Sequence, residues 1–582
     1  MNIKKYLPIL KWLPNYRLAT FNQDLLAAMI VTVMLVPQSL AYAMLAGLPP
    51  EVGLYASIAP LLIYTVFGTS SALSVGPVAV IALMTMTTAG NIVSPEGEAY
   101  LTTVILLTFM SGIMLTLMGL FRLGFLTNFL SHPVISGFIT ASAVIIAVSQ
   151  FKHLLGVSVS GHSLPGLLVA LAQALPEMNL TTLLMGSGTL LFLYATRRWL
   201  GPLLTGLGVS RAIAGSVGRL APILAVLVTT WLTAQFALIE RGVAIVGEVP
   251  AGLPPLALPS TDVSLWQQLW VGALLISIVG FVESVSVGQT LAAKRRERID
   301  PDQELIGLGC ANLGSAVSTG MPVTGGFSRS VVNFDAGART PAAGALTALG
   351  ILVVILWLTP LLRTLPIATL AATIIIAVLS LIDVHAIKHT WRYSKADFSA
   401  MLLTVVITLL QGVEAGILAG VGLSLALHIY RTSRPHTAVV GRVAGSEHFR
   451  NIERHTVETS ANLLIMRVDE SLYFANARYL EDQIQTLVSQ RPKLEHLVIS
   501  CQAVNLIDAS ALDSLESINL RLMDTGIKFH LAEVKGPVMD RLDKVGFPQR
   551  LSGEIFISTF AAWQHLKAAS KNHHDDLEVS EI

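Results

Sequence analysis

Charged residues are scarce in this chain. Asp, Glu, Lys and Arg make up 13% of its 582 residues, about half the share of a typical soluble domain. Hydrophobic residues make up 53%, and the mean hydropathy is +0.66. The net charge is only +1, and no basic tract carries interleaved aromatic residues, which excludes a nucleic-acid-binding surface. The composition is that of an integral membrane protein.

Cysteine is almost absent. Cys310 and Cys501 are the only two cysteines, and they lie in regions of different composition, which excludes a disulfide framework. Neither takes part in a metal-ligand spacing, and no set of residues in the sequence looks like a catalytic constellation. We therefore expect no metal, no cofactor and no enzymatic activity. The N-terminus "MNIKKYLPILKWLPNYR" lacks a small-residue cleavage site, so residues 1–23 are predicted to be a cytoplasmic lead-in rather than a signal peptide.

Long uncharged runs mark the membrane part. The runs 25–48, 99–121 and 340–362 are each uncharged and long enough to span a bilayer. We predict fourteen segments within residues 24–434. With the N-terminus inside, nineteen Lys and Arg residues fall on the cytoplasmic side and three fall outside, a strong positive-inside bias. One segment more or fewer would move every later loop to the other side of the membrane and remove this bias.

A soluble α/β domain follows the last segment. The stretches 463–468, 496–501 and 527–534 are typical of buried strands, and 475–490 and 509–526 have helical periodicity. We therefore predict a cytoplasmic domain over residues 435–568. The polar residues 569–582 are predicted to be a disordered tail.

The membrane part contains an internal repeat. The stretch "PPEVGLYASIAPLLIYTVFGTSSALSVGPVAV" begins at Pro49, and "DPDQELIGLGCANLGSAVSTGMPVTGGFSRSVV" begins at Asp300; each ends in a Gly- and Ser-rich break. Seven crossings in each half, an odd number, place the halves in opposite orientation. Inverted repeats over about 24–235 and 265–434, with matched breaks, indicate the central binding site of a transporter.

The two breaks have the chemistry of an anion site. Irregular backbone at membrane depth is tolerated only inside protein or beside a water-filled cavity. Each break leads into a short helix, "PVAVIALMTM" or "SRSVVNFDAG", whose N-terminal amides and positive dipole end favour anions. Arg329 adds a full positive charge. The structural alternative is a cation that bridges helices or pairs with Glu283.

Other polar residues surround this predicted site. Ser328 could donate its hydroxyl to the anion; the alternative role is an N-cap, and the two roles are compatible. Gln38 and Tyr42 are four residues apart and share a helix face, although Gln38 alone also suits a hydrogen bond between helices. Glu283 is the only acidic residue in its segment. A desolvated carboxylate suits a proton carrier; Na⁺ coordination and pairing with Arg329 are the alternatives.

These motifs resemble those of a known family. The stretches "VPQSLAYAMLAGLPPEVGLYASIAP" (36–60), "SVGPVAV" (74–80) and 283–341 closely resemble the SulP family of anion transporters, and the C-terminal domain resembles the STAS domain of that family. The resemblance implies a 7+7 inverted-repeat, uracil-permease-like fold with a core and a gate domain, an elevator-like motion and a homodimer.

The resemblance also implies residue roles. The anion site of the family falls on Gln38, Tyr42, Val78, Gly326, Phe327, Ser328 and Arg329. The acidic position linked to ion coupling falls on Glu283. In Na⁺-dependent bicarbonate relatives that position is an Asp with a Thr four residues later; Val287 stands there in this chain, which argues against Na⁺.

The C-terminal domain carries a second family motif. "NLIDASALDSL" (505–515) resembles the motif that places a phosphorylatable serine after an Asp, and Ser510 matches that serine. Ala509 and Ala511 replace the usual neighbours, so helix capping by Asp508 or Ser510 is favoured over phosphorylation.

Taken together, the sequence predicts a proton-coupled sulfate importer of a cell inner membrane, with membrane lipid around it and a cytosolic partner for the STAS domain. Bicarbonate or a C4-dicarboxylate is the alternative substrate. A passive anion channel and a membrane-anchored regulator are the alternatives of a different class.

Overall fold

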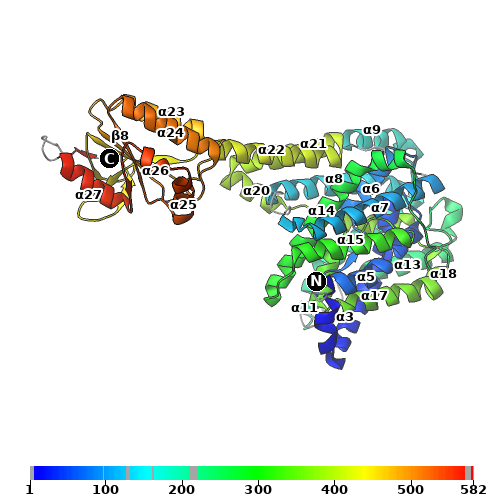
Figure 1. The fold of residues 1–582 in the computed structure, drawn as a ribbon. Helices are drawn as coiled ribbons and strands as arrows, with labels where there is room; N and C mark the ends of the chain where they lie inside the picture. Colours follow the sequence, from blue (N-terminus) through cyan, green and yellow to red (C-terminus); the bar gives the residue numbers. More distant parts are fainter. Residues whose placement is uncertain are drawn as a thin grey trace. The chain divides into compact units, whose positions relative to one another are not determined.

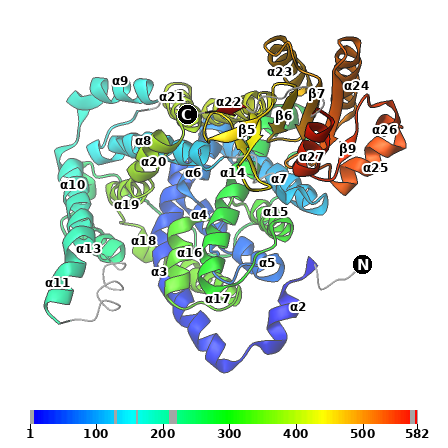
Figure 2. The same ribbon diagram turned by 90° about the vertical axis from the view of Figure 1, so that its left-hand side faces the viewer.

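The chain forms two compact units. The computed structural model describes residues 6–95, 97–125, 131–159, 163–208, 221–570 and 578–580. The first unit comprises Met1–Ser424 and the second Leu425–Ile582 (Figure 1 and Figure 2). Lys4, Lys5, Arg211 and Arg219, which belong to the predicted cytoplasmic charge set, lie outside the described residues.

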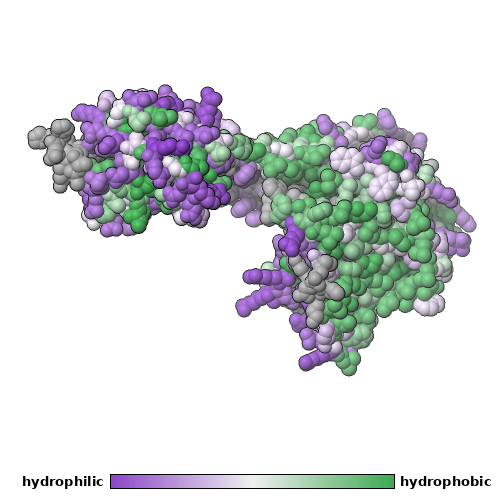
Figure 3. All heavy atoms as spheres, viewed as in Figure 1, coloured by the Kyte–Doolittle hydropathy of each residue, from purple (hydrophilic) through white to green (hydrophobic). Residues whose placement is uncertain are grey.

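The first unit is almost entirely helical and strongly apolar. Figure 3 shows hydrophobic residues over much of its surface, whereas hydrophilic residues predominate on the second unit. Among the described residues, eight helical stretches are long and apolar enough to cross a membrane. They are Leu18–Leu45, Pro50–Phe67, Glu98–Leu120, His132–Leu155, Val263–Arg295, Ala342–Leu362, Ile367–Tyr393 and Val413–Ser433.

One group of helices in this unit packs around α7 and α15, and it corresponds to the predicted core domain. An added Cβ on Gly112 of α7 would lie 2.8 Å from the backbone nitrogen of Leu313 on α15, so this glycine lets the two helices approach closely. The group consists of α3 (Leu18–Leu45), α4 (Pro50–Tyr55), α5 (Ala59–Phe67), α6 (Ala79–Gly90), α7 (Glu98–Leu120), α14 (Val263–Arg295), α15 (Pro301–Val317), α16 (Phe327–Asp335) and α17 (Ala342–Val353).

The other group packs around α8 and α19, and it corresponds to the predicted gate domain. Gly416 and Gly420 of α22 lie directly against Thr408 and Thr404 of α21, so these two helices are also in close contact. The group consists of α8 (His132–Leu155), α9 (Leu164–Ala174), α10 (Leu180–Ala195), α13 (Ala221–Gln235), α19 (Ile367–Leu379), α20 (Val384–Tyr393), α21 (Lys395–Gln411) and α22 (Val413–Ser433).

The fourteen predicted segments and their division into seven and seven are confirmed. The first seven are α3, α4 with α5, α6, α7, α8, α10 and α13; the second seven are α14, α15, α16, α17, α19, α21 and α22. In both halves the third segment is short, because a two-residue strand precedes a half-length helix: β1 (Val75–Gly76) before α6, and β2 (Thr324–Gly325) before α16.

The second unit has a mixed sheet in the order β10-β5-β3-β6-β7-β8-β9, with β4 paired to β3. Strands β6 to β9 are parallel, and β3 is antiparallel to β6. The strands are β3 (Thr437–Arg442), β4 (Phe449–Asn451), β5 (Val457–Thr459), β6 (Leu463–Val468), β7 (His496–Ser500), β8 (Lys528–Ala532), β9 (Ile555–Phe556) and β10 (Glu578–Ser580).

Helices cover both faces of this sheet because side chains along β6 alternate between them. Leu464 and Met466 pack with α23 (Ala477–Ser489), α24 (Ala509–Asp524) and α25 (Gly536–Lys544). Leu463 and Ile465 pack instead with Trp563 of α27 (Thr559–Ser570). The predicted strands and helices of this domain are all present, with their ends shifted by a few residues.

The prediction of a disordered tail over 569–582 is wrong for part of that range. Residues 569 and 570 end α27, and β10 pairs antiparallel with β5, with Glu578 opposite Thr459. An edge strand offers unpaired N–H and C=O groups to any extended segment, which explains how a polar tail joins the sheet. Residues 571–577, 581 and 582 lie outside the described residues.

Candidate functional site

The two breaks of the inverted repeat meet in a short antiparallel ladder. Val75 of β1 lies opposite Gly325 of β2, and Gly76 lies opposite Thr324. All four residues are buried. Because each strand runs directly into a half-length helix, the ladder places the N-termini of α6 and α16 side by side.

Both helices begin without a side-chain cap. The N-cap residues are Val78 for α6 and Gly326 for α16; both have extended backbone, and neither receives a capping hydrogen bond. The first N–H groups of a helix have no partner within the helix, and they carry about half a positive charge. Two such ends at one place form an anion-binding surface made of backbone. The alternative role of Ser328 as the N-cap does not hold, because Gly326 has that position.

Arg329 occupies the space between the two helix ends. Its side chain is 2% exposed, and Nη1 donates a hydrogen bond to the carbonyl oxygen of Pro77 at 2.5 Å. Nε and Nη2 are buried and have no hydrogen-bond partner among the described residues. The guanidinium thus links the two halves of the repeat through Nη1, and its Nε and Nη2 are left to donate hydrogen bonds to a ligand. The predicted alternative of an ion pair with Glu283 does not occur in the described structure.

Two glycines allow the guanidinium to lie this close to the backbone. A Cβ added to Gly326 would lie 3.0 Å from Nη2 of Arg329, and a Cβ added to Gly76 would lie 3.3 Å from the same atom. Both separations are tighter than ordinary van der Waals contact. A side chain at either position would therefore force the Arg329 guanidinium to shift by a few tenths of an ångström.

Helix α3 completes the site on one side, because it packs against both α6 and α16. Tyr42 is buried and lies within electrostatic range of Arg329. Gln38 is half-buried, and Phe327 and Ser328 are exposed at the start of α16. Gln38 forms no hydrogen bond with another described residue, so the alternative of a helix-to-helix bond is not observed. Helix α3 continues without interruption through Pro37.

Glu283 faces a different surface. It lines a cavity of about 20 Å³ between α14, α8 and α22, together with Val279, Phe138 and Ile417. The other residues around this cavity are apolar. Glu283 makes no hydrogen bond or ion pair with any described residue, although Arg329 lies within electrostatic range. The predicted coupling residue is therefore at the boundary between the core and gate groups, beside the site but not in it.

Glu304 holds the first break in place. This carboxylate is 1% exposed and accepts hydrogen bonds from the Thr69 amide at 2.7 Å, the Thr69 hydroxyl, the Ser70 amide at 3.2 Å and the Tyr64 hydroxyl at 2.7 Å. The amides of an irregular segment thus find buried partners, as buried backbone requires. Ser330 of α16 also accepts from the Ser74 amide at 2.9 Å.

The second break is held in a similar way by α15 and α14. The Asn312 amide side chain donates to the carbonyl oxygen of Val323 and accepts from the Val323 amide, both at 2.9 Å. Ser284 accepts from the Gly325 amide at 2.8 Å and shares a 2.6 Å hydrogen bond with Thr324. These supporting residues were not predicted. Their signal is a buried polar residue in an otherwise apolar segment, but sequence does not say which backbone group each one meets.

The arrangement is chemically suited to a small anion. It offers backbone amides and guanidinium donors, with no acidic side chain hydrogen-bonded to Arg329. Groups of His, Cys, Asp and Glu that could hold a metal ion are absent from the described part of the chain. The site therefore has the means to bind and orient an anion.

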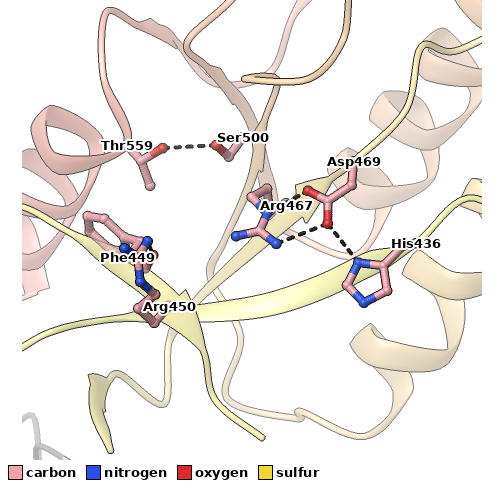
Figure 4. Close-up of polar contacts among 7 residues, drawn as sticks. All are labelled: His436, Phe449, Arg450, Arg467, Asp469, Ser500 and Thr559. Carbon is pink, nitrogen blue, oxygen red and sulfur yellow. Dashed lines mark hydrogen bonds and ion pairs between the residues drawn. The ribbon is translucent and has the colours of Figure 1, made fainter. Parts of the chain in front are cut away.

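The STAS-like unit contains a second polar cluster, at its entry (Figure 4). Asp469 accepts from Arg467 Nε at 2.6 Å and pairs with His436 Nδ1 at 2.6 Å. Burial alone would raise the pKa of Asp469, but the bonds from Arg467 and His436 outweigh it and hold the pKa below its ordinary value. This cluster ties β3 to the end of β6.

The predicted cap of α24 is confirmed for one of its two candidates. Asp508 accepts from the Ala511 amide at 2.8 Å and from the Phe474 amide at 2.9 Å. Ser510 is exposed in the first turn of α24 and is not the cap. Phosphorylation of Ser510 remains the disfavoured alternative.

Comparisons with known proteins agree with this architecture. The model of the sulfate permease family matches residues 21–404, and the model of the STAS domain matches residues 454–563. The chain is 35% identical over 562 residues to the probable sulfate transporter 4.2 of Arabidopsis thaliana, covering 94% of this chain and 81% of that protein. It is 31% identical over 560 residues to the high affinity sulfate transporter 1 of Stylosanthes hamata, covering 93% of this chain and 82% of that protein.

Solved structures show the same fold at lower identity. SLC26A9 superposes with a TM-score of 0.89 at 22% identity, covering 98% of this chain and 94% of that one. The transmembrane domain of the cyanobacterial bicarbonate transporter BicA superposes with a TM-score of 0.58 at 22% identity, covering 70% of this chain and 99% of that one.

Proposed function

Because the chain belongs to the sulfate permease family and carries a STAS domain, we propose that it is a secondary active transporter that takes up sulfate together with protons. Anion transport by this family is supported by the sulfate transporters to which the chain is similar. The observation that carries the proposal for this chain is Arg329, whose Nε and Nη2 are buried without a partner between two uncapped helix ends.

Sulfate fits this donor set. Its oxygens accept several hydrogen bonds at once, and a guanidinium can bind two of them in parallel. The amides around Phe327 and Ala79 would supply further donors, and the Ser328 hydroxyl and the Gln38 side chain are placed to add contacts. The two dipole ends and Arg329 compensate most of the charge of a divalent anion. We propose Gln38, Tyr42, Val78, Gly326, Phe327, Ser328 and Arg329 as the substrate-binding residues.

The mechanism we propose is an elevator-like motion of the core group against the gate group. The site is built entirely from α3, α6 and α16, which belong to the core group, so the anion would move with it. We propose that the N-terminus and the STAS domain lie in the cytoplasm, which the distribution of Lys and Arg supports, and that the protein lies in a cell inner membrane. The family resemblance supports a homodimer and a cytosolic partner for the STAS domain.

Glu283 is our candidate for the coupling residue. It lies where the core group meets apolar residues of α8 and α22. A charged carboxylate without a partner is costly in apolar surroundings, so movement of the core past the gate is easier when Glu283 carries a proton. Proton binding would then be coupled to translocation of the anion.

Uptake into proteoliposomes tests the proposal. Labelled sulfate should accumulate against its gradient when the lumen is made alkaline, and a protonophore should abolish accumulation. Glu283→Gln should still allow sulfate exchange but lose the response to the pH gradient. Arg329→Ala should weaken sulfate binding by about a hundredfold, as expected for loss of hydrogen bonds to a charged group.

The competing substrates and mechanisms are distinguished in the same assay. If labelled bicarbonate or succinate enters and sulfate neither enters nor competes, the substrate assignment is wrong. Uptake that only equilibrates, without concentration, would indicate a passive channel. Arg329→Ala with unchanged affinity would contradict the proposed anion site.

A further inference from the structure

A surface groove separates α10 and α13, which lie side by side in the gate group (Figure 2). Its volume is about 510 Å³. Its floor is formed by Met185 and Thr189 of α10 and by Ala225 and Thr229 of α13. The residues that line the groove are separated in sequence from those assigned to the anion site, and none of the anion-site residues lines the groove.

The groove is apolar even where threonines line its floor. The Thr189 hydroxyl donates to the carbonyl oxygen of Met185, and the Thr229 hydroxyl donates to that of Ala225, both at 2.8 Å. These hydroxyls are therefore satisfied within their own helices. The walls are exposed hydrophobic side chains, among them Leu184 and Val228. An occupant of this groove must be hydrocarbon along its length.

The chain that continues beyond the groove-lining part of α10 is cationic and aromatic. Phe192 lines the groove near the end of α10, and the chain continues into η4 (Thr196–Leu200). There Arg198 is exposed, and Trp199, 59% exposed, packs edge-on against Tyr194 at a ring separation of 6.3 Å. Aromatic and basic residues in this combination are typical of the level of lipid head groups.

The neighbouring arginine keeps η4 in place. Arg197 Nη1 donates to the carbonyl oxygen of Ile376 on α19 at 2.9 Å. Arg197 is thus engaged with protein, whereas Arg198 has no hydrogen-bond or ion-pair partner among the described residues. A guanidinium at this level recognises a phosphate better than an uncharged head group.

We propose that this groove binds an acyl chain of an anionic phospholipid, whose phosphate pairs with Arg198. Hydrocarbon is what surrounds α10 and α13, because both are segments of the membrane unit. The charge of Arg198 in η4 selects the head group. The proposal is independent of which anion the protein carries, because it concerns the lipid-facing side of the gate group.

Gly188 offers a direct test. It lines the groove, and a Cβ added there meets no atom within 4 Å, so Gly188→Phe fills the groove without a clash. The matched control is Gly422→Phe on α22, where an added Cβ also meets no atom within 4 Å. The readout is native mass spectrometry of the whole protein released from nanodiscs that contain equal amounts of phosphatidylglycerol and phosphatidylethanolamine.

The wild type and Gly422→Phe should retain phosphatidylglycerol, and Gly188→Phe should retain roughly tenfold less, as expected when about two buried methylene groups are displaced. Arg198→Gln should remove the preference for phosphatidylglycerol, whereas Arg392→Gln, at another exposed arginine, should keep it. Val228→Trp fills the groove from α13 and should repeat the loss if Gly188→Phe folds poorly.

Two outcomes would overturn the proposal. One is equal retention of phosphatidylglycerol by the wild type and both groove-filling variants. The other is a loss of dimer, with lipid retention unchanged, in the groove-filling variants, which would make a second copy of the chain the occupant. Sulfate uptake that fails in the wild type would contradict the proposed function and leave the lipid result standing.

Discussion

The side chain of Arg329, in the second half of the repeat, bonds directly to the first half. Its Nη1 bonds to Pro77, which is 252 residues away in sequence, and its other two nitrogens are buried without a partner. A buried donor without a partner costs about 1–3 kcal/mol. The anion-free site is therefore unfavourable for this side chain, and a bound anion would remove that cost.

The glycine beside this guanidinium provides a first prediction. In Gly326→Ala the new Cβ would lie 3.0 Å from Arg329 Nη2, so the side chain must move away from the helix ends. We expect the sulfate KM in proteoliposome uptake to rise about tenfold, the loss of one charge-assisted hydrogen bond. Gly90→Ala, where the added Cβ meets nothing within 4 Å, should leave KM unchanged; an equal effect of both would refute the steric argument.

A second prediction concerns the buried His530 of the STAS unit. It accepts from the Glu554 amide through Nδ1 at 2.9 Å and shares a 3.1 Å hydrogen bond with His496. Burial, with the nearby charges of His496 and Lys528, lowers the pKa of His530 from 6.5 to about 4. The unfolded chain therefore binds a proton at higher pH than the folded domain does.

Stability from this histidine is complete above pH 6.5 and is lost as the pH falls toward about 4. Urea unfolding of the isolated C-terminal unit should show the free energy of unfolding falling with pH in this window, with His530 contributing up to about 1.4 kcal/mol per pH unit. His530→Gln should flatten the slope, whereas His448→Gln, at an exposed position, should not. An unchanged slope in His530→Gln would assign the acid sensitivity to other groups.

Among the elements, the two-stranded ladder of β1 and β2 is too short to be stable alone. It persists because side chains from neighbouring helices hold its backbone: Ser330 of α16 accepts from the Ser74 amide, and Ser284 of α14 accepts from the Gly325 amide. Helix α16, which follows the second break, therefore supports the first break through Ser330. The positions of the N-terminal ends of α6 and α16 thus depend on each other.

Removing either serine should impair binding more than folding. Ser330→Ala and Ser284→Ala each leave a buried amide without an acceptor, a cost of about 1–3 kcal/mol, and we expect the sulfate KM to rise about fivefold to tenfold. Ser111→Ala is the matched control, since it breaks a buried 2.9 Å serine pair with Ser277 between α7 and α14. If Ser111→Ala raises KM as much, the effect reflects general packing rather than support of the ladder.

On the scale of the whole molecule, one side-chain hydrogen bond joins a helix of the core group to a helix of the gate group among the described residues. Thr88 of α6 donates to Glu414 of α22 at 2.5 Å. Thr88 lies near the C-terminal end of α6, and Glu414 lies in the first turn of α22. A hydrogen bond to a charged acceptor contributes about 1.5–3 kcal/mol, so this bond favours the arrangement of the two groups seen here over any other arrangement.

Thr88→Val should therefore change turnover. We expect the maximal uptake rate to change about threefold to tenfold, with sulfate affinity within about twofold, because the bond stabilises one arrangement by an amount of this order. The control is Thr87→Val, whose hydroxyl bonds only to the carbonyl oxygen of Met84 in its own helix. Equal changes in both variants would show that the link between the groups does not limit transport.

The sequence allowed the order of segments to be predicted, because hydropathy and charge are local properties. The start of α16 at Phe327 and the break before α6 followed from runs of Gly, Ser and Pro. The support by Glu304, Asn312, Ser284 and Ser330 was not predicted. Each of these side chains bonds to a backbone group on another segment, and the sequence around a residue does not indicate which backbone group that will be.

The sequence by itself indicated that this protein spans a membrane in an inverted repeat, because charges are few and the spacing, the two matched breaks and the topology agree. It also placed a single arginine beside the second break. Only the tertiary structure decided that the two breaks pair as antiparallel strands, that Arg329 bonds to Pro77, and that Glu283 lines a cavity with residues of α8 and α22. These outcomes depend on packing between segments that are far apart in the chain, which local composition does not specify.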